Sequence, residues 1–288
     1  MKVYIDGKFY EKEDAKVSVF DHGLLYGDGV FEGIRAYDRL VFRLKEHIDR
    51  LYESAHTLMI QMCVTKEQMT KAVVDSLKEN KLDDAYIRLI VTRGTGDLGL
   101  DPRKCDGKTT VIIIADKIKL YPEKVYTEGL KIITVPTVRN QAEAINPQIK
   151  SLNYLNNILG KMEAVNCGYD EAIMLDSLGF VAECTGDNLF IIKNGHLFTP
   201  PYYSGLKGIT RGAVLDLADG MKNPVREQMI TRHEVYNADE CFLTGTAAEI
   251  APIVMVDGRS IGTGKPGKLT LELIKKYREL TKKDGVKY

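Results

Sequence analysis

Apolar and polar residues alternate with a period of two in several short segments of the chain. In residues 30–37 this alternation predicts a strand with one face formed by Phe31, Gly33, Arg35 and Tyr37. In residues 85–92 it predicts another strand, on which Tyr86 and Arg88 share a face. The wholly apolar residues 111–115 predict a strand that is buried on both faces.

Other segments repeat their apolar residues at the three- and four-residue spacing of a helix. Residues 44–59 show this spacing clearly. Thr65 and Gln68 form a capping-box sequence, which predicts the start of a second helix. Further helices are expected to begin at Leu155, near Ile209 and after Gly267.

Turn sequences and one more strand complete the pattern of the second half. A strand is expected at 130–135, and hairpins are expected to turn at 177–179 and at Asn194–Gly195. The mixture of elements predicts a mixed α/β (α+β) fold. A length of 288 residues corresponds to about two domains. We expect a small domain at 1–120, a linker at 121–129 and a larger domain at 130–288.

The charge balance and the cysteines exclude several classes of protein. There are 40 basic and 40 acidic residues, so the chain has no basic footprint for nucleic acid. No apolar run reaches the roughly 20 residues of a membrane span, and the N-terminus has no signal-peptide pattern. The five cysteines are widely spaced without a CxxC motif, which predicts neither a disulfide framework nor a metal site. We expect a cytoplasmic protein, and the charge balance does not exclude a small anionic ligand, which needs only a few local donors.

Two residues stand out as candidates for chemistry. Lys150 is the one charged residue between Ala144 and Gly160. A lysine desolvated among apolar and amide groups becomes an amine nucleophile, although most lysines are simply solvated. Glu183 lies between small residues in an expected strand, where it is either a solvent-facing residue or a buried partner for a cation. The solvent-facing interpretation is favoured for Glu183 by the usual exposure of glutamate.

Two glycine-containing segments are candidate anion sites. Gly208–Thr210 opens an expected helix, whose free amides and positive dipole end suit an anion. Simple N-capping by Thr210 is the alternative. Gly245–Ala247 forms a tight turn whose amides could hold a carboxylate or phosphate, and a plain turn is the alternative.

Two arginines receive different interpretations. Arg50 lies opposite Leu44, Leu51 and Leu58 on its helix, which predicts a solvated side chain. Arg88, beside Tyr86, either binds a carboxylate in a cleft or lies on an exposed strand face.

Seven blocks of sequence occur together and in constant order over nearly the whole chain. They are YGDGVFEGIRAY, FRLKEHIDRLYESA, AYIR, IKSLNYLNN, VAECTGDNLF, LKGITR and TGTAAEI. In this order they resemble the class IV aminotransferases of pyridoxal-phosphate fold type IV, and most of all the branched-chain amino-acid aminotransferases. The resemblance implies a two-domain enzyme with the cofactor between the domains.

The resemblance also implies which residues hold pyridoxal 5′-phosphate. Lys150 would form the internal Schiff base, Glu183 would pair with the pyridine nitrogen and Tyr154 would bond the ring hydroxyl oxygen. Leu206 would pack on the ring. The phosphate would be bound by Arg50, Ile209, Thr210 and Thr246.

For the substrate, the resemblance implies L-leucine, L-isoleucine or L-valine, with 2-oxoglutarate as the acceptor and ping-pong kinetics. Tyr86, Thr246 and Ala247 would hold the α-carboxylate. The side-chain pocket would be lined by Phe31, Gly33 and Tyr154. The distal carboxylate of glutamate would be bound by Arg88, Tyr121 and, from a neighbouring subunit, Tyr26, with the neighbour's loop near Leu100 closing the pocket. A homodimer or a trimer of dimers is therefore implied.

The chain departs from the family pattern in two places. Lys207 stands before GIT where many relatives have proline, which matters little if backbone amides do the binding. The segment 115–120 lacks an aromatic residue that some relatives have, which affects the expected pocket near Tyr121. Three other functions compete with the first: a D-amino-acid aminotransferase, an aminodeoxychorismate lyase, and a non-catalytic anion-binding protein.

Overall fold

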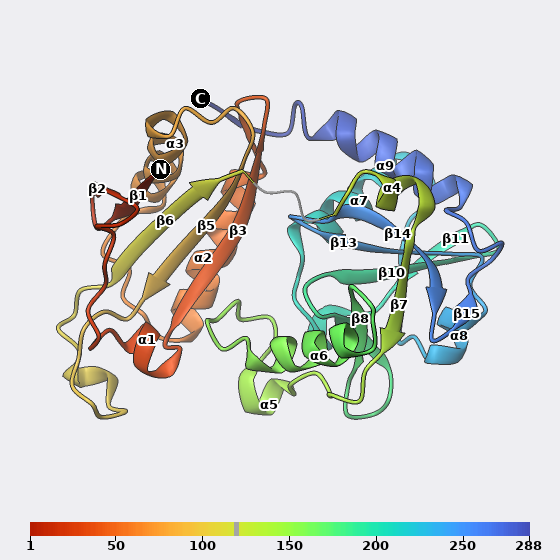
Figure 1. The fold of residues 1–288 in the computed structure, drawn as a ribbon, viewed down its shortest axis with the longest axis horizontal. Helices are drawn as coiled ribbons and strands as arrows, with labels where there is room; N and C mark the ends of the chain where they lie inside the picture. The colour runs from red at the N-terminus through yellow and green to blue at the C-terminus, as the bar shows by residue number, and fades with distance from the viewer. Residues whose placement is uncertain (118–120) are drawn as a thin grey trace. The chain divides into compact units, whose positions relative to one another are not determined.

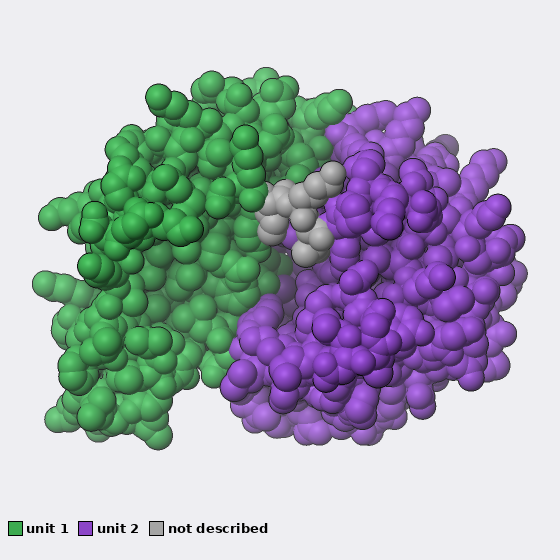
Figure 2. Space-filling model, viewed as in Figure 1, with its two compact units in different colours: residues 1–118, 149–153, 281–288 green, residues 119–148, 154–280 purple. Residues whose placement is uncertain are grey.

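The computed structural model describes residues 1–117 and 121–288, and the chain forms two compact units (Figures 1 and 2). Unit 1 contains Met1–Ile118, Ile149–Asn153 and Thr281–Tyr288, and unit 2 contains Lys119–Gln148 and Tyr154–Leu280. The expected boundary after residue 120 falls at residues outside the described part of the chain. The segment 121–129, expected to be a linker, contains helix α4 (Lys124–Glu128). The division into domains at 120 and 130 stays a prediction.

Unit 1 is built on an antiparallel sheet of seven strands in the order β16-β4-β3-β5-β6-β1-β2. Its strands are β1 (Lys2–Ile5), β2 (Lys8–Glu11), β3 (Gly29–Tyr37), β4 (Leu40–Phe42), β5 (Ala85–Thr92), β6 (Thr110–Asp116) and β16 (Gly285–Lys287). The short helices α1 (His22–Tyr26) and η1 (Pro102–Lys104) lie in its loops. The last strand therefore brings the end of the chain back to the first unit.

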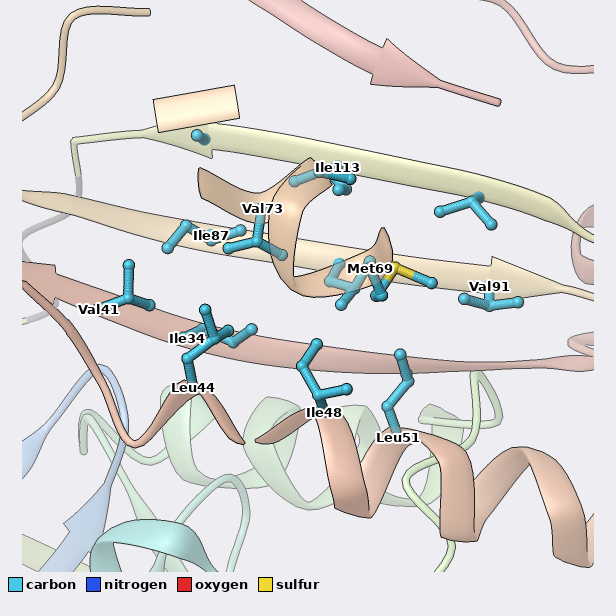
Figure 3. Packing of buried hydrophobic residues seen from close by; sticks show 14 of the residues in the cluster. Ile34, Val41, Leu44, Ile48, Leu51, Met69, Val73, Ile87, Val91 and Ile113 are labelled. Atoms are coloured by element: carbon cyan, nitrogen blue, oxygen red, sulfur yellow. The ribbon is translucent and has the colours of Figure 1, made fainter. Parts of the chain in front are cut away.

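The helices α2 (Leu44–Thr57) and α3 (Lys66–Glu79) pack on one face of this sheet (Figure 3). The apolar residues of α2 recur at helical spacing, and they point at alternate residues of the strands. The predicted helix at 44–59 is confirmed, as is the capping box of Thr65 and Gln68, which has both of its hydrogen bonds. The strands predicted at 30–37 and 85–92 are confirmed as β3 and β5.

The strand predicted at 111–115 is present as β6, but the prediction of burial on both faces was wrong. Val111, Ile113 and Ala115 are buried, whereas Ile112 and Ile114 are partly exposed. The helices cover one face of the sheet, so only alternate residues of β6 enter the core.

Unit 2 is a mixed sheet of nine strands in the order β12-β11-β10-β13-β14-β7-β8-β9, with β15 beside β14. Its strands are β7 (Leu130–Thr134), β8 (Ala172–Leu175), β9 (Val181–Cys184), β10 (Asn188–Lys193), β11 (His196–Thr199), β12 (Arg226–Glu227), β13 (Glu240–Gly245), β14 (Glu249–Val256) and β15 (Arg259–Ser260). The β8–β9 and β10–β11 hairpins confirm both predicted turns, and Asn194 and Gly195 both have positive φ.

Helices surround the sheet of unit 2. They are α4, α5 (Ala142–Ile145), α6 (Leu155–Asn166), η2 (Tyr202–Ser204), α7 (Ile209–Gly220), α8 (Arg232–Tyr236) and α9 (Lys268–Leu280). The three helix starts predicted from the sequence are confirmed by α6, α7 and α9. Helices α4 and α9 pack against β14, and α7 packs against β13. Among the helices of the described residues, none has both the length and the apolar character needed to cross a bilayer.

Truncation of a core residue of α2 tests the packing of unit 1. Leu51 is fully buried, so Leu51→Ala is expected to lower the free energy of unfolding by about 2–5 kcal/mol, because it leaves a cavity. Leu178 in the β8–β9 turn is 77% exposed, and Leu178→Ala is expected to change stability by less than about 0.5 kcal/mol. Urea unfolding measures both. Equal losses for the two variants would contradict the burial of Leu51.

Candidate active site

Lys150 lies at the edge of the unit 1 sheet, in the segment that follows residue 148. Its carbonyl oxygen accepts from the Phe31 amide at 2.9 Å, and its own amide donates to Ser54 Oγ on α2 at 3.2 Å. Its Nζ lies 4.5 Å from the centroid of the Phe31 ring. The backbone of Lys150 is thus fixed against both β3 and α2, and its ammonium group lies over an aromatic face.

The face of the sheet opposite the helices brings together four other predicted residues. Gly33 is directly opposite Arg88 in the β3–β5 register. The guanidinium carbon of Arg88 lies 4.5 Å from the centroid of the Phe31 ring and 5.6 Å from that of Tyr86. A Cβ atom at position 33 would lie 2.2 Å from Tyr86 Oη, so glycine is required for the Tyr86 side chain to cross β3. Through Phe31, this group is continuous with Lys150.

Arg50 is buried, so the prediction of a solvated side chain was wrong. It is 7% exposed, and its Nε and Nη2 donate to the two oxygens of Glu32 at 2.8 and 2.7 Å. His47 Nδ1 lies 2.7 Å from Glu32 Oε2, and Glu32 itself is completely buried. On α2 the residues His47, Arg50 and Ser54 form a polar stripe at helical spacing, and this stripe also faces the sheet. The helix therefore buries more than its apolar side.

The charges of this cluster follow from its burial and its neighbours. Burial alone raises the pKa of Glu32, but Arg50 and His47 outweigh burial and lower the pKa to about 2. Burial lowers the pKa of His47, and the positive charges of Arg50 and Lys150 lower it further against the pull of Glu32. At neutral pH, Glu32 is ionised and His47 is a neutral imidazole that donates from Nδ1.

Glu183 is also buried, so its solvent-facing interpretation was wrong. Its side chain accepts from Arg139 Nε at 2.8 Å, from the Leu206 amide at 2.9 Å and from Asn188 Nδ2 at 3.3 Å. These contacts fix Leu206, another predicted residue, beside the carboxylate. Arg139 and Asn188 were not singled out in the sequence. No local pattern identifies Arg139, since it lies 44 residues before its partner.

Helix α7 begins at Ile209 with Gly208 as its N-cap, and no side chain makes a capping hydrogen bond. The alternative in which Thr210 is the N-cap is therefore wrong, because Thr210 lies inside the helix and is buried. A Cβ atom at position 208 would lie 2.1 Å from Asn188 Oδ1, so any other residue at this cap would require the Asn188 side chain to move. The helix start thus presents its first amides without a side-chain cap.

The turn Thr246–Ala248 connects β13 to β14, and it is held from two sides. Tyr126 Oη on α4 donates to the Ala248 carbonyl at 3.0 Å. A Cβ atom at Gly245 would lie 1.7 Å from Asp187 Oδ1, so a larger residue where the turn begins would require the Asp187 side chain to move. The hydroxyl of Thr244, just before the turn, is buried without a hydrogen-bond partner in the described part of the chain.

For four other predicted residues, the structure gives a location and a degree of burial. Tyr154 is half-buried at the start of α6, and Ala247 lies within the β13–β14 turn. Tyr121 is buried in the apolar core of unit 2, where burial raises its pKa. Leu100 is exposed in the glycine-rich loop between β5 and β6.

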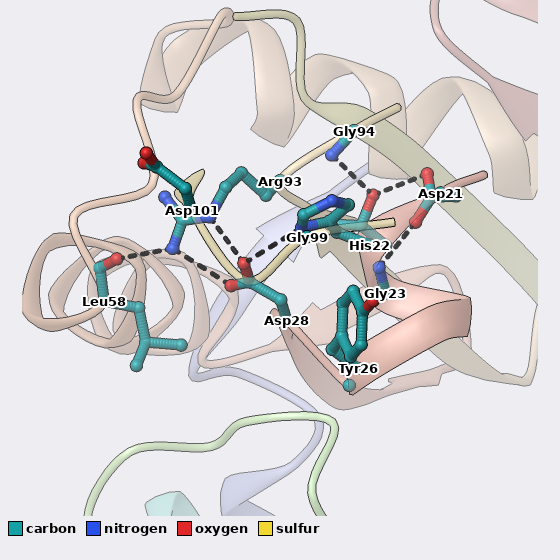
Figure 4. A network of polar contacts seen from close by, with 12 residues as sticks. Asp21, His22, Gly23, Tyr26, Asp28, Leu58, Arg93, Gly94, Gly99 and Asp101 are labelled. Carbon is teal, nitrogen blue, oxygen red and sulfur yellow. Dashed lines mark hydrogen bonds and ion pairs between the residues drawn. The ribbon is translucent and has the colours of Figure 1, made fainter. Parts of the chain in front are cut away.

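Tyr26 belongs to a polar network of unit 1 (Figure 4). Its hydroxyl donates to the Leu98 carbonyl, and its ring lies edge-on to His22 with centroids 5.2 Å apart. His22 Nε2 donates to the Asp97 carbonyl at 3.1 Å. Asp28 Oδ2 accepts from Arg93 Nε at 2.6 Å and lies 3.9 Å from His22 Nδ1. The network fixes Tyr26 and the glycine-rich loop to each other.

In the part of the chain that the structure describes, no group of acidic, histidine and cysteine side chains could hold a metal.

A pH-dependent loss of stability is expected from the neutral state of His47. Its pKa is lowered in the folded protein, so below the ordinary value of 6.5 the unfolded chain binds more protons than the folded one. The wild-type protein therefore loses stability as the pH falls from 6.5, by up to about 1.4 kcal/mol per pH unit from this group. His47→Asn keeps a donor for Glu32 but does not titrate, so its stability should fall less steeply between pH 6.5 and 5. Urea unfolding at several pH values measures this, and identical slopes would show that folding does not lower the pKa of His47.

Comparison with known proteins identifies the family of the chain. The family described as Amino-transferase class IV matches residues 29–256. A putative branched-chain-amino-acid aminotransferase of Methanocaldococcus jannaschii is 55% identical over 288 residues, which cover 100% of this chain and 99% of that protein.

Solved structures agree with this assignment. The crystal structure of the Escherichia coli branched-chain amino acid aminotransferase is similar with a TM-score of 0.94 and 38% identity, over 97% of this chain and 94% of that one. The branched-chain amino acid aminotransferase of Thermobaculum terrenum, in its PLP-form, has a TM-score of 0.86 and 32% identity, over 97% and 93% of the two chains. The chain therefore belongs to the class IV aminotransferases, with the mixed α/β fold of type IV pyridoxal-phosphate enzymes, and within them to the branched-chain amino-acid aminotransferases.

Proposed function

We propose that the protein transfers the amino group of L-leucine, L-isoleucine or L-valine to 2-oxoglutarate with pyridoxal 5′-phosphate as its cofactor. One observation within unit 1 carries the proposal beyond family membership. The Lys150 ammonium and the Arg88 guanidinium both lie 4.5 Å from the centroid of the same Phe31 ring. A reactive amine and a cation suited to a carboxylate thus flank one apolar surface.

The residues of unit 2 fit the cofactor. Glu183 supplies a buried carboxylate, and a negative charge favours the protonated form of a pyridine nitrogen. Leu206 is fixed beside that carboxylate, and we propose that it packs on the ring. We propose that the phosphate is bound by the amides of Ile209 and Thr210, by the Thr210 hydroxyl and by Thr246. The uncapped start of α7 supports this, because free amides at a helix start suit phosphate.

The residues of unit 1 supply the amine and a further phosphate ligand. We propose that Lys150 Nζ is the group that binds the cofactor aldehyde, and that Arg50 binds the phosphate. Tyr154 of unit 2 is proposed to bond the ring hydroxyl oxygen. When bound, pyridoxal phosphate accepts the electron pair that is released at the substrate Cα.

The chain's own groups then hold the substrate and move its proton. Lys150 Nζ takes the proton from the substrate Cα as a general base and later donates it as an acid. Tyr86 and the amides of Thr246 and Ala247 are proposed to hold the α-carboxylate, which orients the Cα–H bond. The Lys150 amine lies over the ring of Phe31, which provides one apolar surface beside it.

One pocket must accept both an aliphatic side chain and the carboxylate of glutamate. Phe31 and Gly33, with Tyr154, are proposed to line the apolar part. Arg88 and Tyr121 are proposed to accept the distal carboxylate. An apolar pocket with one arginine at its edge can serve both substrates, because the guanidinium binds a carboxylate and its planar face packs on an aromatic ring.

We propose further that the active protein is at least a homodimer, located in the cytoplasm, in which Tyr26 and Leu100 complete the partner's site. The exposed apolar residues of α6 support an interface between subunits. They recur at helical spacing and are 48–73% exposed: Leu155, Ile158, Leu159, Met162 and Val165. A continuous apolar stripe of this kind is typical of a surface that another protein covers.

Removal of the proposed reactive amine tests the mechanism. Lys150→Ala is expected to lose the absorbance of the cofactor bound through an imine and to lower kcat by at least about a thousandfold, because the base is absent. Borohydride reduction followed by peptide mapping should label Lys150 in the wild-type protein. Lys161, which is partly exposed on α6 and pairs with Glu171, provides a matched control, so Lys161→Ala should keep both properties. Labelling of another lysine would contradict the proposal.

The amino donor distinguishes the proposed activity from related ones. The purified cofactor form is expected to lose its aldehyde absorbance with L-leucine and not with D-alanine. The reverse result would indicate a D-amino-acid aminotransferase. Turnover should also depend strictly on 2-oxoglutarate, and release of pyruvate without an acceptor would indicate a lyase. Stopped-flow absorbance and coupled product assays measure these outcomes.

A further inference from the structure

Glu32 and His47 have no part in the mechanism proposed above, although both are titratable, almost wholly buried and in direct contact. Glu32 is completely buried, His47 is 1% exposed, and both lie between β3 and α2. We propose that Glu32 and His47 are positioning residues, which fix the Arg50 guanidinium in the orientation that recognises the cofactor phosphate. The inference rests on the proposed role of Arg50 as a phosphate ligand.

The geometry of the contact determines the orientation of Arg50. Its Nε and Nη2 reach separate oxygens of Glu32 at 2.8 and 2.7 Å. Two parallel hydrogen bonds fix the plane and the direction of a guanidinium, whereas one bond would leave it free to rotate. Without this restraint a long arginine side chain would lose rotational freedom each time that phosphate is bound.

His47 fixes the carboxylate in turn. Its Nδ1 donates to Glu32 Oε2 at 2.7 Å, the same oxygen that accepts from Arg50 Nη2. The imidazole is neutral, because burial lowers its pKa. It therefore restrains the carboxylate without adding a positive charge that would compete with Arg50 for Glu32.

The energetics of burial argue against a purely structural role. Replacing a buried ion pair with apolar residues of similar volume is often neutral or stabilising, so such a pair is weak evidence for stability. The surrounding contacts of α2 with the sheet are apolar, as Leu44, Ile48 and Leu51 show. A charged cluster in this layer carries a desolvation cost, which is consistent with a functional use of Arg50.

The charge of Glu32 makes the inference sharply testable. A carboxylate behind Arg50 opposes the negative phosphate, so charge alone predicts that neutralising Glu32 would tighten the binding of phosphate. If Glu32 instead acts by orienting the Arg50 guanidinium, replacing Glu32 would weaken the binding of phosphate. In Glu32→Gln the side-chain amide group would face an N–H donor of Arg50 or His47, so the paired hydrogen bonds could not both form.

The experiment compares two ligands that differ only in the phosphate. The full-length wild-type protein and Glu32→Gln are titrated with pyridoxal 5′-phosphate and with pyridoxal, and the imine absorbance gives each dissociation constant. We expect Glu32→Gln to weaken the binding of pyridoxal phosphate about tenfold or more, and the binding of pyridoxal less than about twofold. The ³¹P NMR signal of the bound phosphate should also shift. Unchanged or tighter binding of pyridoxal phosphate would overturn the proposal, as would an equal loss for both ligands.

Control variants separate positioning from folding. Asp284→Asn removes another carboxylate–arginine contact of unit 1, in which Arg43 Nε donates to Asp284 Oδ2 at 2.8 Å, and it should leave both dissociation constants unchanged. If Glu32→Gln does not fold, His47 carries the test. His47→Leu removes the donor and should weaken pyridoxal phosphate selectively, whereas His47→Asn keeps a donor and should bind nearly as the wild-type protein does. Equal behaviour of the two His47 variants would overturn the proposal.

Failure of the proposed function would give a different result. If the protein did not bind the cofactor aldehyde through an amine, neither ligand would give an imine absorbance in the wild-type protein. If only the positioning inference failed, the wild-type protein would bind both ligands and Glu32→Gln would match it. The two failures are therefore distinguishable in one set of titrations.

Discussion

Each unit of the protein buries a carboxylate, and an arginine compensates its charge. In unit 1 the pair is Glu32 with Arg50, and in unit 2 it is Glu183 with Arg139. An isolated carboxylate in such a place would be protonated or would destabilise the fold. The surrounding groups therefore have to be placed accurately, and much of the local structure follows from that need. Glycine at position 205 is one example, since a Cβ atom there would lie 2.9 Å from Glu183 Oε2.

The regular elements could be predicted from the sequence because their causes are local. The alternation in β3 and β5, the capping box at Thr65 and the turn at Asn194–Gly195 each depend on residues that are neighbours in the chain. The same reasoning failed for Arg50 and Glu183. Their burial depends on partners 18 and 44 residues away, and helical periodicity contains no information about such partners.

The seven ordered sequence blocks succeeded where periodicity failed, because they identified a family. Membership of that family suggests roles for several residues of the blocks, Lys150 and Glu183 among them. It supplied nothing for Arg139, Asn188 or His47, whose importance is visible only in the hydrogen bonds of the folded chain. The sequence predicted that both faces of β6 are buried, whereas only one is, and the reason is related. A run of apolar residues does not indicate how many layers of helix cover a sheet.

Helix α2 shows how one element can serve stability and chemistry together. Its apolar stripe packs into the core, and the adjacent stripe of His47, Arg50 and Ser54 meets the sheet at Glu32 and the backbone of Lys150. Arg50 and Ser54 are four residues apart and thus lie on the same side of the helix. A rotation of α2 would therefore displace both contacts at once. The apolar core prevents this rotation. The core therefore also sets the separation between Arg50, the proposed phosphate ligand, and Lys150, the proposed reactive amine.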